Sequence, residues 1–447
     1  MNTNRQQISP RLSSGFRDYL PEEMIPRQWM LDTIRRVFER FGFLPLDTPS
    51  IERREVLTGG DPEFSKQIYD ATLRGKTPGE LALRFDLTVS LARIVALYPN
   101  RIVKPFKRYQ MGTVYRGEKP QAGRFNEFTQ FDADIIGSDR VGADAEIVSV
   151  MYETLMALGV MNFRIKVNNR RVLNGLADYV GYPSELTPEV LRLIDKLDKI
   201  GWNDLASELA INASLSPAQL EKLKVFLDLR ADSNEGITAA VIRLMPNSSE
   251  AVRGATELAE ITKIVDALGV PREAWEIDLS VARGLGYYTG PVFETSLINL
   301  PKIGSVFSGG RYDDLVARFG KDSIPATGAS VGVDRLFVAL KTLGLLPEKK
   351  STTKVVVLNF DQSAEGYCNH LVATLRRSDI SSELYLGKEK TLGAQLNYAL
   401  RQEVPVVIIA GGRERDGEVV QIKFLAEKRQ VVVPLKDLID TVKGFVT

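Results

Sequence analysis

The chain has 447 residues, of which 44% are hydrophobic and 26% are charged, so it is long enough for two or three globular domains. It contains one cysteine, Cys368, and one histidine, His370, which excludes a disulfide framework, a closed zinc site and a Cys/His catalytic pair. The 58 basic and 57 acidic residues nearly cancel, so a nucleic acid would have to bind a local basic surface.

The sequence also indicates where the protein works. No stretch approaches the roughly twenty apolar residues needed to cross a bilayer, and the first seven residues lack the apolar run of a secretion signal. We therefore expect a cytoplasmic protein that has no contact with a membrane. We expect no resident metal, so any metal ion enters with a substrate.

The N-terminal region predicts one helix and one strand. Residues 22–41 carry apolar side chains at helical spacing, such as Ile34 and Phe38, and the pattern ends at Gly42. Residues 43–49 predict a strand that contains two prolines. Because proline cannot donate to a sheet ladder, we expect this strand at an edge or an interface.

Residues 107–137 predict two antiparallel strands joined by a polar loop at 117–123. Side chains alternate along a strand, so the second strand has one polar face. That face is typical of a solvated outer sheet surface and equally of a cleft, and the strand alone does not decide between them. Its members are Phe128, Gln130, Asp132 and Asp134.

The rest of the chain predicts a helical region and then a second domain. A helix is expected over 143–158, a helical insertion over about 170–268, strands near 276–300, 305–307 and 329–333, and a helix over 335–343. Beyond a linker at 346–353, strands and helices alternate, which predicts a small α/β domain. The expected boundaries are 1–345 for the first domain and 354–447 for the second.

Arginine and glycine occur together in four segments. Arg116 and Arg124 flank the hairpin loop, and the others are 283–290, 308–313 and 328–335, each with one arginine. Guanidinium groups bind phosphates with two parallel donors, and glycine lets the backbone approach a ligand closely. Any one segment is also typical of surface turns, but their recurrence favours a triphosphate-binding cleft.

These segments resemble the motifs of a known family. The Arg116 hairpin resembles the second motif of class II aminoacyl-tRNA synthetases, 328–335 resembles the third, and Pro49 stands where the first has its dimer-interface proline. Segments 283–290 and 308–313 resemble two segments particular to the histidine-specific members. The resemblance covers nearly the whole chain. It implies an α+β catalytic domain with a central, mainly antiparallel sheet, a helical insertion, a C-terminal α/β anticodon-binding-like domain and a homodimer.

The resemblance also implies a reaction and its residues. Members join the carboxylate of histidine to the α-phosphate of ATP, which brings Mg²⁺ with it, and then pass the histidyl group to the 3′ end of histidine tRNA. The implied catalytic residues are Arg116 and Arg283. The implied ATP-binding residues are Arg116, Glu118, Arg124, Phe128 and Arg335. The implied histidine-binding residues are Asp86, Thr88 and Gln130 for the α-amino group and Asp134 and Tyr288 for the imidazole ring. The implied tRNA-binding residues are Lys119 and Gln121.

The sequence departs from the commoner bacterial pattern at several positions. Asp86 and Asp134 stand where many members carry Glu, Thr129 where His is frequent, and Gly286 where an acid is often found. The shorter carboxylates imply a rearranged pocket. For Tyr287, beside Tyr288, we expect a packing role on the opposite face of a strand.

Two other readings stay open. The first is a non-catalytic paralogue, such as a regulatory subunit of histidine biosynthesis or a sensor of uncharged tRNA. The second is a class II ligase for another amino acid. The retained arginines and the terminal domain favour the enzyme, and 283–290 favours histidine. In the terminal domain, basic residues either contact tRNA phosphates or belong to a solvated surface. They are Lys388, Lys390, Arg401 and Arg413 to Arg415.

Overall fold

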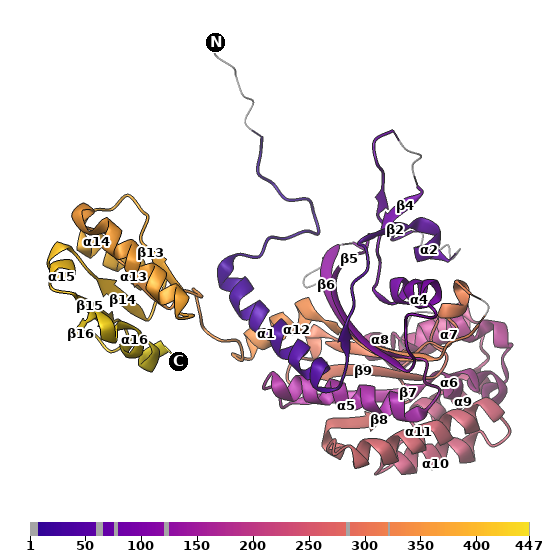
Figure 1. The fold of residues 1–447 in the computed structure, drawn as a ribbon. Coiled ribbons are helices and arrows are strands. Elements are labelled where there is room, and N and C mark those ends of the chain that lie inside the picture. Colours follow the sequence, from indigo (N-terminus) through magenta and orange to yellow (C-terminus); the bar gives the residue numbers. More distant parts are fainter. Residues whose placement is uncertain are drawn as a thin grey trace. The chain divides into compact units, whose positions relative to one another are not determined.

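The computed structural model describes residues 8–59, 66–75, 79–119, 125–282, 287–320 and 322–446 (Figure 1). The chain is divided into two compact units. One comprises residues 1–17 and 31–345, and the other residues 18–30 and 346–447. Each unit is described by itself.

The first unit is built on an eight-stranded sheet in the order β1-β5-β6-β11-β10-β9-β7-β8. All neighbouring pairs are antiparallel except β1 with β5 and β7 with β8, which confirms the mainly antiparallel sheet. The strands are β1 (Leu44–Pro45), β5 (Phe106–Tyr115), β6 (Glu127–Ile136), β7 (Phe163–Asn169), β8 (Trp275–Ile277), β9 (Pro291–Leu297), β10 (Phe307–Arg311) and β11 (Ala326–Gly332). A small sheet beside it has the order β2 (Ile51–Arg53), β4 (Leu81–Leu83), β3 (Asp70–Ala71).

The predicted hairpin is confirmed as β5 and β6, and the proline-containing strand is confirmed at the sheet edge as β1. The strand expected over 276–300 is instead two strands, β8 and β9. Both pair with β7, one on each side, so the chain between them leaves the sheet. Strand β7 was not predicted from the sequence, and its partners lie more than a hundred residues further along the chain.

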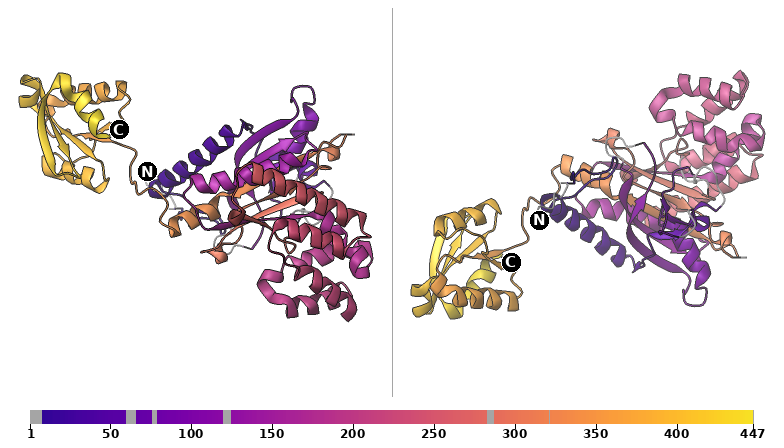
Figure 2. Two further views of the ribbon diagram at one scale, coloured as in Figure 1. Left: turned by 90° about the horizontal axis from the view of Figure 1, so that it is seen from below. Right: turned by 90° about the horizontal axis from the view of Figure 1, so that it is seen from above.

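Helices pack on this sheet (Figure 2). In α1 (Pro21–Arg40), the ring of Phe38 contacts those of Tyr109 on β5 and Phe131 on β6, which buries the predicted apolar stripe. The helix gives way to a turn at Gly42, whose φ of 78° suits glycine. The other helices on this unit are α2 (Arg54–Thr58), α4 (Thr88–Leu97), α5 (Val141–Ala157) and α12 (Val333–Thr342).

The helical insertion is confirmed. Its helices are α6 (Arg170–Asn174), α7 (Thr187–Ile194), α8 (Leu197–Asn212), α9 (Pro217–Leu227), α10 (Asn234–Leu244) and α11 (Ser249–Ala267). Leu223 and Phe226 are fully buried, as the helical periodicity predicts. Ser216 and Gln219 form a capping box that fixes the start of α9.

The second unit contains the expected alternation of strands and helices. A five-stranded sheet has the order β13-β12-β14-β15-β16, in which β12 pairs in parallel with both β13 and β14. The hairpin β15/β16 and the last helix, α16, were not predicted. The elements are β12 (Val355–Val357), α13 (Glu365–Arg377), β13 (Ser382–Leu384), α14 (Leu392–Arg401), β14 (Val406–Ile409), α15 (Gly412–Asp416), β15 (Val419–Phe424), β16 (Arg429–Pro434) and α16 (Leu438–Val446).

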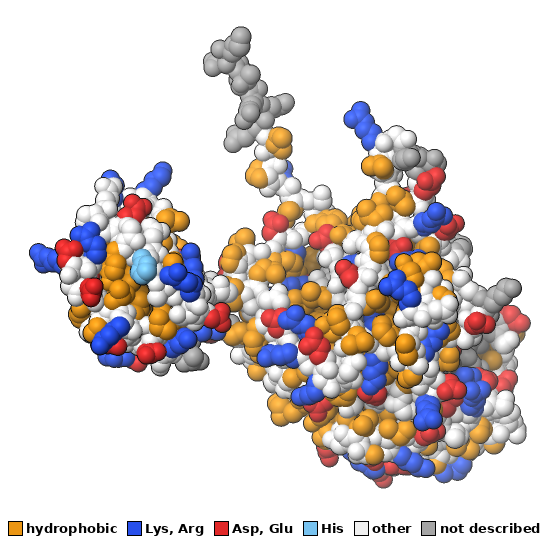
Figure 3. Space-filling view, in the orientation of Figure 1, with side chains coloured by type: hydrophobic (Ala, Val, Ile, Leu, Met, Phe, Trp, Pro, Cys, Tyr) orange, Lys and Arg blue, Asp and Glu red, His pale blue; other side chains and the backbone are white. Residues whose placement is uncertain are grey.

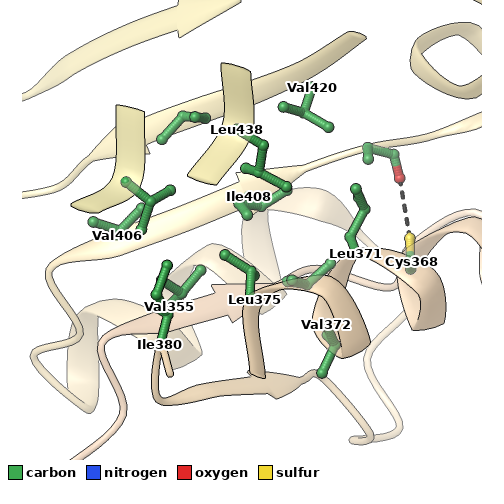
Figure 4. Close-up of a cluster of buried hydrophobic side chains, with 14 of the residues drawn as sticks. Val355, Cys368, Leu371, Val372, Leu375, Ile380, Val406, Ile408, Val420 and Leu438 are labelled. Carbon is green, nitrogen blue, oxygen red and sulfur yellow. Dashed lines mark hydrogen bonds between the residues drawn. The ribbon is translucent and has the colours of Figure 1, made fainter. Parts of the chain in front are cut away.

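The single cysteine of the chain lies in the core of the second unit. Leu371 and Leu375 of α13 pack against Val355 and Ile408 of the sheet (Figure 4). Cys368 is buried beside them, and its Sγ donates to the carbonyl oxygen of Ala410 over 3.4 Å. Burial raises the pKa of this thiol to about 11, so the reactive thiolate is scarce at neutral pH.

On the face of the molecule shown in Figure 3, basic, acidic and hydrophobic side chains are interspersed, which agrees with the near-zero net charge. Among the described residues, no helix is both long enough and apolar enough to span a membrane.

Candidate active site

A cavity of about 250 Å³ lies in the first unit, where the end of β5 and the start of β6 meet the end of β11 and the starts of β10 and α12. Four residues predicted to bind ATP line it together, although they come from segments far apart in the sequence. They are Arg116, Glu118, Phe128 and Arg335. The remaining lining residues are Phe125, Gln130, Ser305, Val306, Phe307, Ser308, Ser330, Gly332 and Asp334.

Arg116 is held by aromatic rings. Its guanidinium carbon lies 4.4 Å from the ring centroid of Phe85 and 5.1 Å from that of Phe128. Its Nε donates to the carbonyl oxygen of Phe85 over 3.3 Å. Contacts with the faces of the planar group orient it and leave edge donors for an anionic ligand.

Asn126, a residue not predicted from the sequence, connects the start of β6 to the backbone that follows β5. Its Nδ2 donates to the carbonyl oxygens of Arg116 and Glu118, both over 2.8 Å, and its N–H donates to Gly15 over 2.8 Å. Gly15 has a φ of 84°, and a Cβ there would overlap the Asn126 side chain. A short amide directly before a strand, at the end of a polar loop, is the signal that would have identified it.

Arg335 and Asp334 join the start of α12 to the other walls of the cavity. Arg335 Nη1 donates to the carbonyl oxygen of Ser305 over 3.1 Å. Asp334 Oδ2 accepts the backbone N–H of Thr129, over 3.0 Å. The helix is therefore anchored to β6, and Arg335 is half-buried at the cavity wall.

The polar face of β6 continues from the cavity into the protein. Asp132 and Asp134 are only 2% and 3% exposed, and Asp86, at the start of α4, is 2% exposed. The structure thus decides between the two interpretations of this face, because a solvated sheet surface would leave the carboxylates in water. The polar face of β6 therefore lines the cavity at Phe128 and Gln130 and is buried inside the protein at Asp132 and Asp134.

Several buried acceptors on and beside this face have no hydrogen-bond partner among the described residues. Oδ1 of Asp86 accepts the N–H of Val89 over 2.9 Å, but its Oδ2 accepts nothing. Oε1 of Gln130 and Oδ1 of Asp132 are buried in the same way, while Nε2 of Gln130 donates to Oγ of Ser330. Buried polar atoms are normally paired, so a ligand rich in N–H donors, such as an ammonium group, suits this wall.

Burial also changes the acidity of these groups. It raises the pKa of Asp132 to about 7, against the opposing effect of the Arg108 guanidinium. It raises the pKa of Asp86 as well, opposed by the Val89 N–H and by Arg116. A cationic ligand would compensate the desolvated carboxylates and favour their charged forms.

Tyr287 and Tyr288 lie in the segment before β9 and are both half-buried. The expected placement on opposite faces of a strand is wrong, because this segment is outside the sheet. The two rings meet edge to face with centroids 5.1 Å apart, and Tyr287 also contacts the ring of Tyr312 at 6.0 Å. Both pack beside α4 and the ends of β6 and β11.

Glycines allow the side chains of the pocket to approach the sheet. A Cβ on Gly328 would lie 2.0 Å from Oδ1 of Asp134, and one on Gly310 would lie 2.9 Å from Cδ1 of Tyr288. The expectation that these glycines permit close approach is confirmed at both positions.

Arg311, the arginine of segment 308–313, is not part of the cavity. Its Nη2 lies 2.5 Å from Oδ2 of Asp144 on α5, and it also donates to the carbonyl oxygens of Ser138 and Arg140. Segment 308–313 reaches the cavity through Ser308, whereas its arginine joins β10 to α5. The sequence does not predict this ion pair, because Asp144 is distant along the chain.

Three predicted site residues, Arg124, Arg283 and Gln121, lie outside the described residues. Lys119 is exposed where the described part of the hairpin loop ends. Thr88 begins α4, two residues after Asp86.

Comparisons with known proteins fit this architecture. The family model described as Histidyl-tRNA synthetase matches residues 15–336, and one described as Anticodon binding domain matches 354–444. Histidine--tRNA ligase of Wolinella succinogenes is 43% identical over 93% of this chain and 94% of its own, and that of Rhodopirellula baltica is 43% identical over 94% of each.

Among solved structures, the histidyl-tRNA synthetase of Nostoc sp. PCC 7120 has a TM-score of 0.86 and 33% identity, covering 98% of this chain and 100% of that one. The cavity, the buried carboxylates beside it and these similarities agree: the chain belongs to the histidyl-tRNA synthetase family.

Proposed function

We propose that this protein activates histidine with ATP and transfers it to the 3′ end of histidine tRNA. The observation that carries the proposal is the continuity of two sites. The arginine-lined cavity suits a polyphosphate, and the polar face of β6 leads from it to buried carboxylates that suit an amino acid.

The residues around the cavity receive the following roles. Arg116 binds the carboxylate of histidine and the α-phosphate, Phe128 stacks on adenine, Glu118 binds the adenosine end, and Arg335 binds the outer phosphates. Their shared lining of one cavity supports this assignment. Arg124 on the outer phosphates and Arg283 as a second catalytic arginine complete the set that the family resemblance implies.

The residues of the deeper pocket bind the amino acid. Asp86, Thr88 and Gln130 receive the α-ammonium group, which is supported by the unpartnered acceptor atoms of Asp86 and Gln130. Asp134 and Tyr288 receive the imidazole ring. Groups fixed on both ring nitrogens would reject analogues that lack those nitrogens by a factor of about 10⁴.

The reaction needs little covalent participation by the protein. A carboxylate oxygen of histidine attacks the α-phosphorus, and the bond to the bridging oxygen of pyrophosphate breaks. A hydroxyl of the terminal tRNA ribose then attacks the carbonyl carbon of the adenylate, and AMP leaves. Arg116 lowers the first barrier by aligning the reactants and by stabilising the negative charge that builds up on the phosphate oxygens.

Mg²⁺ enters as the complex with ATP. Glu118 and Asp334 are the carboxylates that line the cavity, and oxygen donors of this kind suit Mg²⁺. When bound, the ion neutralises phosphate charge.

Binding of tRNA involves both units. The family description of residues 354–444 supports anticodon binding by the second unit. Lys119 and Gln121, in the hairpin loop, contact the acceptor end, and exposed Lys388 and Arg401 are candidates for phosphate contacts. This role places the protein in the cytoplasm.

We also propose a homodimer through the region of Pro49. Exposed apolar side chains surround this region on β1, β2 and β5: Leu44 is 58% exposed, Ile51 49% and Met111 45%. A second copy would cover them.

Pyrophosphate exchange into ATP tests the activation step. The full chain is incubated with Mg²⁺, ATP and each proteinogenic amino acid in turn, without tRNA. Exchange that only histidine stimulates supports the proposal. Exchange with another amino acid contradicts the pocket assignment, and no exchange favours a regulatory paralogue.

A further inference from the structure

Arg108 is a fully buried cation beneath the amino-acid pocket. It lies on β5 directly opposite Asp134 of β6, and its side chain is 0% exposed. Its Nη2 lies 2.8 Å from Oδ2 of Asp134 and 4.0 Å from Oδ2 of Asp132. No function assigned above uses this residue.

A purely structural role explains Arg108 poorly. None of its three guanidinium nitrogens makes a hydrogen bond of good geometry within the described residues. Removing such a group from water is costly, and apolar residues commonly replace buried ion pairs without loss of stability. A group retained at that cost is a candidate for a functional role.

Asp134 is held from both sides. The hydroxyl of Tyr312 donates to Oδ1 over 2.5 Å, while Arg108 faces Oδ2. The ring of Tyr312 is buried at 2% exposure in the cluster around α4, so this donor is rigid. The orientation of the carboxylate is therefore fixed by two neighbours that belong to different strands and loops.

Arg108 also governs the charge of Asp134. Burial raises the pKa of this carboxyl group, and the Arg108 guanidinium is the largest opposing influence, followed by the Tyr312 hydroxyl. Asp86 acts in the same direction as burial. The ionisable groups that influence one another in this pocket are Asp86, Arg108, Arg116, Asp132, Asp134, Tyr287, Tyr288 and Tyr312.

We propose that Arg108 is a positioning residue for histidine binding: it keeps the Asp134 carboxylate charged and, with Tyr312, aimed to accept an N–H of the imidazole ring. This inference rests on the proposed function. Arg108 acts through Asp134 and does not itself touch the substrate. Asp132 is the second carboxylate near the guanidinium, with its Oδ2 4.0 Å from Nη2 of Arg108.

Steady-state pyrophosphate exchange tests the role in Arg108→Met and Arg108→Lys variants of the full chain. We expect Arg108→Met to raise the KM for histidine about tenfold or more, because it weakens a charged hydrogen bond to the ligand, and to leave the KM for ATP unchanged. Arg108→Lys restores the positive charge, so its KM for histidine should recover to within about threefold of wild type. An unchanged KM for histidine, or equal rises in both KM values, would overturn the proposal.

Tyr312→Phe keeps the inference testable if Arg108→Met does not fold. This variant retains the ring in the core and removes only the donor to Oδ1 of Asp134. We expect a smaller rise in the KM for histidine, about threefold to tenfold, with an unchanged KM for ATP. No change in the KM for histidine would contradict the two-sided support of Asp134. Wild-type exchange is measured alongside, because its absence would refute the proposed function rather than this role.

Discussion

Arg311 and Asp144 form a buried ion pair that joins β10 to α5. Nη2 of Arg311 lies 2.5 Å from Oδ2 of Asp144, and the side chains are 7% and 0% exposed. Burial raises the pKa of Asp144 to about 6, and the Arg311 charge opposes that shift, so the carboxylate depends on its partner to remain ionised.

Loss of this partner should destabilise the protein strongly. We expect Arg311→Met to lower the free energy of unfolding by about 3 kcal/mol or more, because it leaves a buried carboxylate unpaired. The double variant Arg311→Met/Asp144→Asn should be less affected than the single one. Urea denaturation of the full chain measures both. Arg272→Met, which breaks exposed pairs with Asp266 and Glu235, is the control and should have little effect. Equal losses for Arg311→Met and Arg272→Met would contradict the argument.

Arg116 should matter for catalysis far more than for folding. We expect Arg116→Lys to reduce the rate of histidine-dependent pyrophosphate exchange by about 100-fold or more, because a point charge cannot reproduce the two-donor contact with developing phosphate charge. The thermal midpoint should stay close to that of wild type. Arg101→Lys alters another arginine stacked on an aromatic ring, that of Tyr98, outside the cavity, and should retain full activity. A large loss of stability in Arg116→Lys would argue for a structural role instead.

The buried carboxylate of Asp132 should give stability a specific dependence on pH. Its pKa is raised from 3.8 to about 7 in the folded protein. Between these values the folded state binds more protons than the unfolded state, so the contribution of Asp132 to stability is present at low pH and is lost as the pH rises through about 7.

Asp132→Asn removes this dependence. Relative to wild type, we expect the variant to gain about 1 kcal/mol or more in free energy of unfolding between about pH 5 and about pH 8. Chemical denaturation without ligands at a series of pH values measures the difference. Asp416→Asn, which changes an exposed carboxylate, should follow the wild-type profile. Parallel profiles for Asp132→Asn and wild type would disprove the prediction.

Gly328 should be required for the shape of the pocket. A methyl group there would lie 2.0 Å from Oδ1 of Asp134, so we expect Gly328→Ala to displace this carboxylate and to raise the KM for histidine about tenfold or more. Gly142→Ala is the matched control, since the nearest atom to its Cβ is 4.0 Å away and the position is helical. Pyrophosphate exchange kinetics distinguish the two variants. An unaltered KM for histidine in Gly328→Ala would contradict the prediction, because it would show that the surrounding residues accommodate the methyl group.

The sequence by itself determined the features that depend on local pattern. The apolar spacing of α1, the antiparallel pairing of β5 with β6 and the alternation of strands and helices in the second unit all appear as predicted. Motif order was equally informative, because Arg116, Glu118, Phe128 and Arg335 line one cavity. Residue type and spacing suffice where a segment's neighbours along the chain decide its structure.

Only the tertiary structure decided what depends on distant partners. It buried the polar face of β6, which the strand's alternation alone left open to two interpretations. It paired Arg311 with Asp144 rather than with a ligand. It also placed Asn126 against the backbone of Arg116 and Arg108 against the carboxylate of Asp134. In each case the role of the side chain is set by groups that sheet pairing and helix packing bring near it. The electrostatic energy of a buried charge depends on those neighbouring groups.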